Sequence, residues 1–310
     1  MKYRKNRRFV KPISEIGFGA WQLGGTGTWG YMTKEEGISL VKEAIKEGVN
    51  FFDTAPGYGQ GKSELILGEA LTEARDKVFI NTKIGHGPNG EYEFTVEGIS
   101  NSIYRSLRNL KTNYLDSVIL HNPERYILEG NTNLFDELGK FKDKGLINGY
   151  GVSIDTLSEL KLTLKNLNVD VIEIMFNIVQ QEVKELFNEV EKRGILLIIK
   201  VPLDSGWLTG KYNHLSKFTG VRDRWSKNDI LARSSIIDKI KNIVKENNLV
   251  HTALRFILSF GEVTTIIPGT KNIDQLKINC LASDDILGSS IKKQLETLYQ
   301  DYIKNLNIPW

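Results

Sequence analysis

The chain alternates between short, mainly apolar runs and longer segments in which apolar residues recur every three or four positions. Continuous apolar runs are typical of parallel strands, because both faces of such a sheet are buried. Eight runs are predicted to form strands: residues 14–20, 50–55, 77–84, 115–122, 148–154, 169–176, 195–203 and 264–270.

Each predicted strand is followed by a segment with helical periodicity. These segments are residues 34–48, 63–74, 95–110, 134–145, 157–167, 183–194, 234–248 and 272–283, the seventh after a long irregular stretch. Several of them end in glycine, at Gly48, Gly145 and Gly194, which is typical of helix C-caps. Thr156 and Glu159 have the spacing of a capping box, and Ser63 is predicted to be an N-cap.

Eight strand–helix units in 310 residues predict a closed (β/α)8 TIM barrel, an α/β fold. No linker-like segment divides the units, so residues 1–310 are predicted to form one domain. A β-hairpin at the N-terminus and a further helix over residues 286–307 lie outside the repeat.

A doubly wound open sheet is the alternative fold, and it would normally carry a glycine fingerprint after its first strand. Gly17 and Gly19 are not followed by the third glycine, because Gln22 occupies that position. A phosphate-loop pattern ending in Gly61, Lys62 and Ser63 also fails, since Pro56 stands where it requires glycine or alanine. A bound dinucleotide would therefore be held without either common glycine loop.

Composition is that of an ordinary globular protein, with 40% hydrophobic and 25% charged residues and a net charge of +3. That charge is too small to predict nucleic-acid binding. Residues 1–11 carry six Lys and Arg, which we interpret as a solvated, charged hairpin rather than a nucleic-acid or membrane arm. The apolar stretch Ile195–Leu203 is too short to span a bilayer, so we expect a soluble, cytoplasmic protein.

The single cysteine, Cys280, excludes an intrachain disulfide and fits a reducing compartment. Its helical context predicts a buried or half-buried thiol.

Polar side chains end three successive predicted strands: Asp53, Lys83 and His121, with Tyr58 in the loop after the first. In a (β/α)8 barrel these groups meet at the carboxyl-end rim. Lys83 is expected to pair with Asp53 and to lower the pKa of Tyr58, which would then exchange a proton near neutral pH. His121 would orient a substrate oxygen.

A metal-dependent barrel hydrolase is a weaker interpretation. The four histidines (His86, His121, His214 and His251) show no paired ligand spacing, so no metal cofactor is predicted.

From Gly17 to Asn279 the chain resembles the aldo-keto reductase family. The resemblance rests on FFDTAPGYGQGKSELILGEAL, TKIG, LHNP, GVSI, VPLDSGWLTGKY and IIPGTKNIDQLKIN. It implies a barrel that binds NADP(H) across the strand ends and transfers hydride between nicotinamide and a carbonyl. Tyr58 would be the general acid, Lys83 and Asp53 its tuning pair, and His121 the second group on the developing alkoxide.

The resemblance also implies a set of cofactor residues. They are Gly19, Ala20, Trp21, Asp53, Ser153, Glu173 and Lys200, then Val201, Pro202, Leu203, Ser205, Gly206, Leu208 and Lys211, and at the adenosine end Gly269, Thr270, Lys271, Gln275 and Asn279. Trp21, Tyr58 and His121 would contact the substrate. Residues 204–232 would fold over the cofactor, with Trp207 and Trp225 either closing the site or packing in the core.

The nicotinamide end departs from the commonest family pattern. Ile154, Glu173 and Lys200 replace the usual Asn, Gln and aromatic residue. Ionised Glu173 would favour the oxidised ring; alternatively, Glu173 pairs with Lys200 and touches no cofactor. Gln275 replaces an Arg at the 2′-phosphate, but Lys271 can supply that charge, so NADP(H) is favoured over NAD(H).

The predicted function is NADPH-dependent reduction of aldehydes or ketones, with a small-molecule carbonyl or alcohol as partner. Alternatives are an NAD(P)+-dependent sugar or polyol dehydrogenase and a cofactor-binding regulatory subunit of the same fold. No nucleic-acid or membrane partner is predicted. The sequence predicts neither the substrate nor an oligomeric state, and a monomer is compatible with it.

Overall fold

A parallel sheet of eight strands forms the centre of the computed structural model, which describes residues 1–25, 30–306 and 308. Each strand pairs with the next along the chain. The strands are β3 (Phe18–Gly19), β4 (Phe51–Asp53), β5 (Phe79–Ile84), β6 (Ser117–His121), β7 (Tyr150–Ile154), β8 (Val171–Met175), β9 (Leu196–Lys200) and β10 (Thr265–Ile266).

The first and last strands of this sheet meet, which closes it into a barrel. The Gly17 amide donates to the Ile266 carbonyl at 2.8 Å, and the Ile266 amide donates to the Glu15 carbonyl at 3.0 Å. A parallel bridge between Gly19 and Gly269 continues the contact. The predicted (β/α)8 barrel is therefore confirmed.

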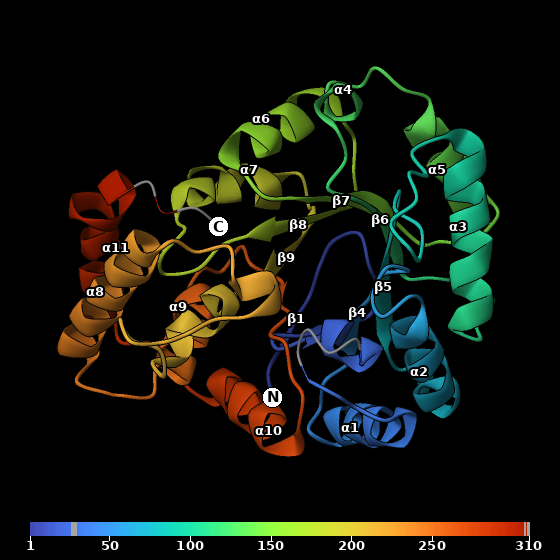
Figure 1. Ribbon diagram of the computed structural model, residues 1–310. Helices are drawn as coiled ribbons and strands as arrows, with labels where there is room; N and C mark the ends of the chain where they lie inside the picture. The colour runs from blue at the N-terminus through green and yellow to red at the C-terminus, as the bar shows by residue number, and fades with distance from the viewer. Residues whose placement is uncertain (26–29, 307, 309–310) are drawn as a thin grey trace.

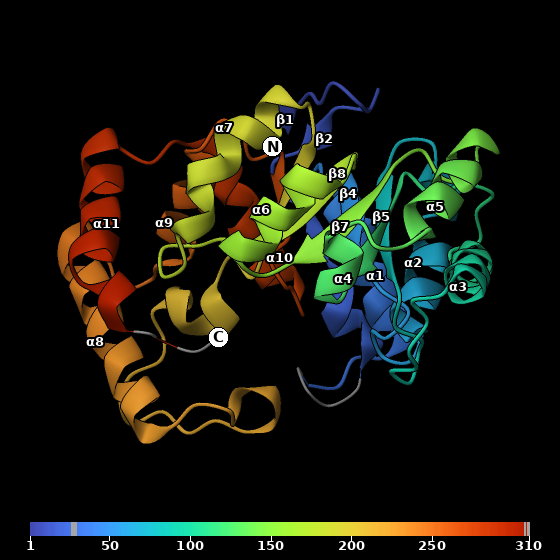
Figure 2. The same ribbon diagram turned by 90° about the horizontal axis from the view of Figure 1, so that it is seen from above.

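Helices form an outer layer around the strands (Figures 1 and 2). They are α1 (Lys34–Lys46), α2 (Lys62–Ala70), α3 (Val96–Asn109), α4 (Arg125–Leu128), α5 (Leu134–Asp143), α6 (Leu157–Asn166), α7 (Phe187–Lys192), α8 (Lys227–Val244), α9 (Val250–Leu258), α10 (Ile273–Leu281) and α11 (Ser289–Asp301). The predicted C-terminal helix is α11, which lies beside α8 in both views. That residues 1–310 form one domain stays a prediction.

Most of the predicted helix caps agree with the structure. Thr156 accepts from the Glu159 amide in the predicted capping box, and Gly48 and its counterparts follow helices with positive φ. Ser63 is not an N-cap, however. Gly61 (φ 86°) is the N-cap instead, so Ser63 lies inside α2. Its hydroxyl donates to the Ala20 carbonyl at 2.8 Å. No prediction covered α4 or α9.

The basic N-terminus forms the predicted hairpin, with β1 (Tyr3–Arg4) antiparallel to β2 (Ile13–Ser14). The expectation that its charges are solvated was wrong for three of them. Arg4 pairs with Glu15, Arg8 with Asp170 and Lys11 with Asp116, at 2.9, 2.9 and 3.0 Å. The hairpin is thereby fixed to the barrel.

The barrel interior is layered, because alternate strand residues point inward. One cluster in the interior is apolar and includes Phe9 of the hairpin. Its other members are Ile13, Phe51, Phe79, Ile119, Val171, Leu196, Ile198 and Ile267. Two residues further along their strands, the buried side chains become polar, as at Asp53, Asn81 and Glu173. A dry base thus supports a polar layer at the carboxyl ends.

Among the described residues, no helix is long and apolar enough to cross a membrane. Cys280 is buried as predicted, and burial raises the pKa of its thiol to about 12.

Candidate active site

Four polar side chains meet at the carboxyl ends of β4, β5 and β6. Lys83 Nζ lies 2.5 Å from Asp53 Oδ2 and 5.2 Å from the centre of the Tyr58 ring. The Tyr58 and His121 rings are 6.2 Å apart, edge to face. The structure therefore brings together the four residues that strand-end position predicted, and the predicted Asp53–Lys83 ion pair is confirmed.

Strand register positions Asp53. It pairs with Asn81 across β4 and β5, and the Asn81 amide donates to Asp53 Oδ1 at 2.7 Å. The Ser117 hydroxyl in turn donates to Asn81 Oδ1 at 2.5 Å. These bonds fix the carboxylate so that its other oxygen faces Lys83.

Close backbone packing positions the Tyr58 loop. Gly59 has a φ of 60°, and a Cβ on it would lie 2.2 Å from Gly24 Cα. Only glycine fits both the conformation and the contact. The Trp21 ring stacks on Tyr58 with centroids 5.9 Å apart.

Glu173 on β8 is a second carboxylate at Lys83. Its Oε2 lies 3.3 Å from Lys83 Nζ, and its Oε1 accepts from the Ser153 hydroxyl at 3.0 Å. Lys200 instead donates to Ser153 at 2.9 Å and pairs with Asp155 at 2.9 Å. The alternative prediction of a Glu173–Lys200 pair was wrong.

Strand register explains this pairing. Glu173 lies opposite Ile198, whereas Lys200 lies opposite Met175, one layer further toward the carboxyl ends. Lys200 can therefore reach the Ser153 hydroxyl but forms no ion pair with Glu173.

Burial dominates the electrostatics of the acidic and phenolic groups. Burial, reinforced by the Glu173 charge, raises the pKa of Asp53 to about 7 against the lowering effect of Lys83. Burial also raises the pKa of Tyr58 above its ordinary value, and the nearby Lys83 charge does not reverse this. Lys83 lowers the pKa of Tyr58 as expected, but burial outweighs it, so the expectation of a net lowering was wrong.

The two basic groups respond differently. Burial lowers the pKa of Lys83, but the Asp53 and Glu173 carboxylates outweigh it and raise the pKa overall. Burial, with the Lys83 and Lys200 charges, holds the pKa of His121 well below 6.5. At neutral pH the ammonium is thus charged, the phenol protonated and the imidazole neutral.

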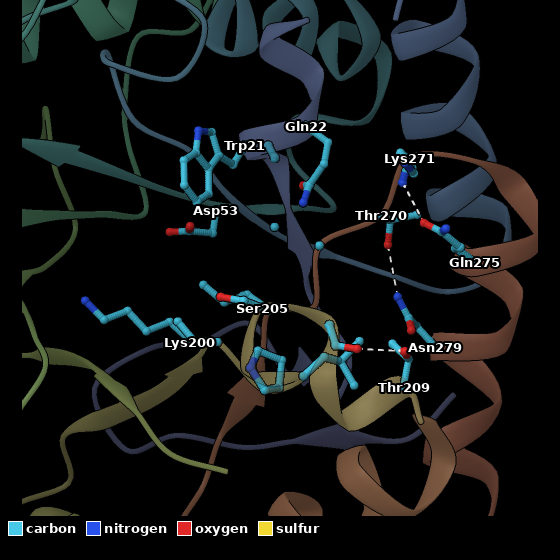
Figure 3. Close-up of a pocket in the computed structure, with 18 of the residues that line it drawn as sticks. Trp21, Gln22, Asp53, Lys200, Ser205, Thr209, Thr270, Lys271, Gln275 and Asn279 are labelled. Carbon is cyan, nitrogen blue, oxygen red and sulfur yellow. Dashed lines mark hydrogen bonds between the residues drawn. The ribbon is translucent and has the colours of Figure 1, made fainter. Parts of the chain in front are cut away.

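A cavity of about 650 Å³ extends from these residues across the strand ends toward α10 (Figure 3). At its far end Asn279 donates to Thr270 at 3.0 Å, and the Lys271 amide donates to Gln275 at 3.2 Å. Most of the predicted cofactor residues line it: Gly19, Ala20, Trp21, Asp53, Glu173, Lys200, Val201, Pro202, Leu203, Ser205, Gly206, Lys211, Gly269, Thr270, Lys271, Gln275 and Asn279.

Some predicted residues lie elsewhere. Ser153 is fully buried and does not line the cavity, and Leu208 packs in the hydrophobic core. Ile154 is also buried in the core. Trp207 and Trp225 pack against each other with centroids 5.8 Å apart in an aromatic cluster, so packing rather than site closure is their role here.

The segment after β9 forms one cavity wall with unusual backbone conformations. Val201, Asp204 and Ser205 have φ of 54°, 46° and 53°. A positive φ at a β-branched residue is strained, and such strain clusters at binding sites. A fully buried ion pair between Asp204 and Arg233 of α8 holds this wall in place.

Sequence reasoning missed several lining residues: Gln22, Asn122, Asp155, Thr209, Arg222, Asn248, Val250, Ile267 and Ile278. Asn122 and Asp155 directly follow strands, so the strand-end rule could have found them. Asn248 and Val250 lie at the start of α9, which no pattern predicted.

A second cavity of about 470 Å³ adjoins the first and shares Trp21, Tyr58 and His121 with it. Its remaining lining residues come from the loops after β4 and β5: Gly57, Gln60, His86, Gly87, Pro88, Asn89 and Gly90. The His86 and His121 rings lie 6.0 Å apart. The phenol and imidazole therefore stand at the border between two cavities.

Within the described ranges, no cluster of three or more His, Cys, Asp or Glu side chains is arranged to hold a metal ion.

The model of the Aldo/keto reductase family matches residues 15–298. The chain belongs to the aldo/keto reductase family. An uncharacterized oxidoreductase of Bacillus subtilis, YqkF, is 26% identical over 293 residues, which cover 92% of each chain. This aldo/keto reductase is accordingly a nicotinamide-dependent oxidoreductase that acts on carbonyl or alcohol groups.

Solved structures share the fold of this aldo/keto reductase. The holo form of aldo-keto reductase AKR11C1 from Bacillus halodurans has a TM-score of 0.81 and 24% identity, with 96% of each chain covered. An aldo/keto reductase from Klebsiella pneumoniae, in complex with NADP and acetate, has a TM-score of 0.71 and 20% identity over 96% of this chain and 95% of that one.

Proposed function

We propose that the protein is an NADPH-dependent reductase of aldehydes or ketones in which Tyr58 is the general acid. The observation that carries this proposal is the position of Tyr58. It lies at the border of two cavities, between the Lys83 ammonium and the His121 ring. The larger cavity runs from these residues to α10, as a site for an extended dinucleotide would, and the smaller one is available to a substrate.

The larger cavity fits a nicotinamide dinucleotide by its polar groups as well as its shape. Gln22 Oε1 is a buried polar atom without a hydrogen-bond partner among the described residues. Glu173 Oε2 has the Lys83 ammonium at 3.3 Å but accepts no hydrogen bond from the described residues, and Gln22 and Glu173 both line the cavity. Such atoms are costly unless a ligand or water satisfies them. As an acceptor, the Glu173 carboxylate suits the N–H group of a carboxamide.

Cationic side chains along the cavity suit the phosphates of NADP(H). Lys211, Arg222 and Lys271 all line it, and Lys271 lies at the α10 end. A cation at that end favours a 2′-phosphate, which NADP(H) carries and NAD(H) lacks. The NADP complex of the Klebsiella pneumoniae relative supports the same choice.

A bound reduced nicotinamide would supply hydride to the carbonyl carbon. Tyr58, protonated at neutral pH, would donate its proton to the carbonyl oxygen as negative charge develops there. The neutral His121 imidazole would donate a second hydrogen bond to that oxygen. Lys83, charged and fixed by Asp53, would stabilise the phenolate that Tyr58 becomes.

The same groups serve alcohol oxidation when Tyr58 acts as base and the oxidised cofactor is bound. Carbonyl reduction is proposed because Tyr58 is held protonated: burial keeps its pKa above the ordinary value. Reduction starts from the protonated phenol, whereas oxidation starts from the phenolate.

A steady-state assay tests the proposal. Purified protein is mixed with NADPH or NADH and a panel of small aldehydes and ketones, and cofactor oxidation is followed. We expect turnover on at least one carbonyl, with a higher kcat/KM for NADPH than for NADH. Tight NADPH binding without turnover on any carbonyl would contradict the proposal and favour a cofactor-binding regulatory subunit.

A further inference from the structure

A cluster of three buried charges borders the larger cavity, which Asp53 and Glu173 line. Asp53, Lys83 and Glu173 are each at most 2% exposed, and Lys83 contacts both carboxylates, at 2.5 and 3.3 Å. Each carboxylate has a second, neutral partner, Asn81 for Asp53 and Ser153 for Glu173. The cluster therefore holds two anions and one cation.

Other charges near the cluster do not balance the excess. Lys200 of β9 reaches Ser153, but Asp155, after β7, pairs with Lys200 at 2.9 Å and offsets it. His121 of β6 faces Tyr58 and is neutral, because burial and the Lys83 charge hold its pKa low. A buried cluster with one excess negative charge tends to neutralise itself by taking up a proton.

We propose that Glu173 is a positioning residue that holds the Lys83 ammonium together with Asp53 and makes the cluster exchange one proton near neutral pH. Whether the cluster holds that proton then sets the acid strength of Tyr58. With the proton bound, the cluster is neutral and the phenol gives up its proton more readily. With it lost, the extra negative charge beside Tyr58 holds the phenolic proton. This inference rests on the proposed function, in which Tyr58 is the acid.

The direction of the effect follows from the charges. The pKa of Asp53, raised by burial and by Glu173 to about 7, marks where the proton leaves. The rate of carbonyl reduction should fall about three- to tenfold as pH rises through this range, because the phenol becomes a weaker acid. Without the Glu173 charge, Asp53 and Lys83 balance each other. The inflection in the pH dependence of the reduction rate should then move down by more than one pH unit.

The test compares Glu173→Gln with the wild type in two measurements. The first is the pH dependence of kcat/KM for reduction, in which we expect the inflection near pH 7 to move below pH 6. The second needs no cofactor: the free energy of unfolding by urea, from pH 5 to 8. The wild-type cluster binds more protons when folded than when unfolded, so its contribution to stability falls as pH rises. Subtracting the variant's unfolding free energy from that of the wild type cancels the opposite contribution of His121, and this difference should fall as pH rises.

Glu64→Gln is the matched control. Glu64 is also a buried carboxyl of raised pKa, but it contacts Thr82 and Asn109 outside the barrel interior. This control should lessen the pH dependence of unfolding and leave the inflection of kcat/KM in place. Lys200→Met is a second test that keeps Glu173. Loss of that cation should move the inflection to higher pH.

The outcomes separate this inference from the proposed function. If no carbonyl is reduced, the proposed function fails, while the pH dependence of unfolding still tests the buried cluster. A folded Glu173→Gln with an unmoved inflection and an unchanged unfolding slope would overturn the inference. If that variant does not fold, an inflection that Lys200→Met leaves unmoved would overturn it.

Discussion

The buried ion pair between Asp204 and Arg233 anchors the cavity wall after β9, and Asp204→Asn should break it. Both side chains are 1% exposed, and the Arg233 guanidinium lies 4.9 Å from the centre of the Trp225 ring. Removing one partner of a buried pair leaves the other charge uncompensated, which costs about 3–5 kcal/mol. With an unfolding entropy of about 2 cal/mol/K for each of 310 residues, 4 kcal/mol lowers Tm by about 6 °C.

The wall carries Leu203, Ser205 and Gly206, so the same change should also weaken cofactor binding. We expect the Kd for NADPH to rise about tenfold, because the wall must be reordered when cofactor binds. Differential scanning calorimetry gives the Tm, and fluorescence titration gives the Kd. Asp223→Asn, at an exposed position in the same segment, is the control. A Tm and a Kd both unchanged in Asp204→Asn would refute the reasoning.

Three further predictions follow from the geometry. Lys271→Met should weaken NADPH binding about tenfold and leave NADH binding within twofold, as measured by titration, because the side chain lies at the 2′-phosphate end of the proposed site. Gly24→Ala should lower kcat and cost about 1–3 kcal/mol in urea denaturation, because its Cβ would lie 2.6 Å from Gly59 in the Tyr58 loop. His121 has a folded-state pKa below its unfolded value, so its contribution to stability is present above pH 6.5 and lost as pH falls. In urea denaturation below pH 6.5, His121→Asn should therefore reduce this loss of unfolding free energy by up to about 1.4 kcal/mol per pH unit.

The strand ends were the predictable part of this site. Apolar runs located each strand, and the polar residue that ended a run fell at the carboxyl-end rim, as with Asp53 and His121. This works because every strand of a parallel barrel presents the same end to the same face.

Contacts across the barrel were not predictable in the same way. The partner of Glu173 depends on strand register and on which residue faces it through the interior, and neither leaves a local pattern. The net rise in the pKa of Tyr58 likewise comes from burial, which depends on the whole fold. Ser153 follows the family motif, yet its hydroxyl is engaged by Glu173 and Lys200.

The N-terminal charges show the same limit. The basic composition of residues 1–11 fits a solvated surface, but Arg8 and Lys11 have acidic partners more than a hundred residues away. Sequence composition records the charges and not their partners.

The central claim is that Tyr58 donates the proton to the substrate oxygen. Its most direct test is kcat for carbonyl reduction by Tyr58→Phe, measured beside the Kd for NADPH, with Tyr92→Phe as a control at an exposed tyrosine. The account predicts a loss in kcat of about a thousandfold or more in Tyr58→Phe with the Kd within twofold, and little change in the control. A Tyr58→Phe variant that keeps its wild-type kcat would contradict the claim.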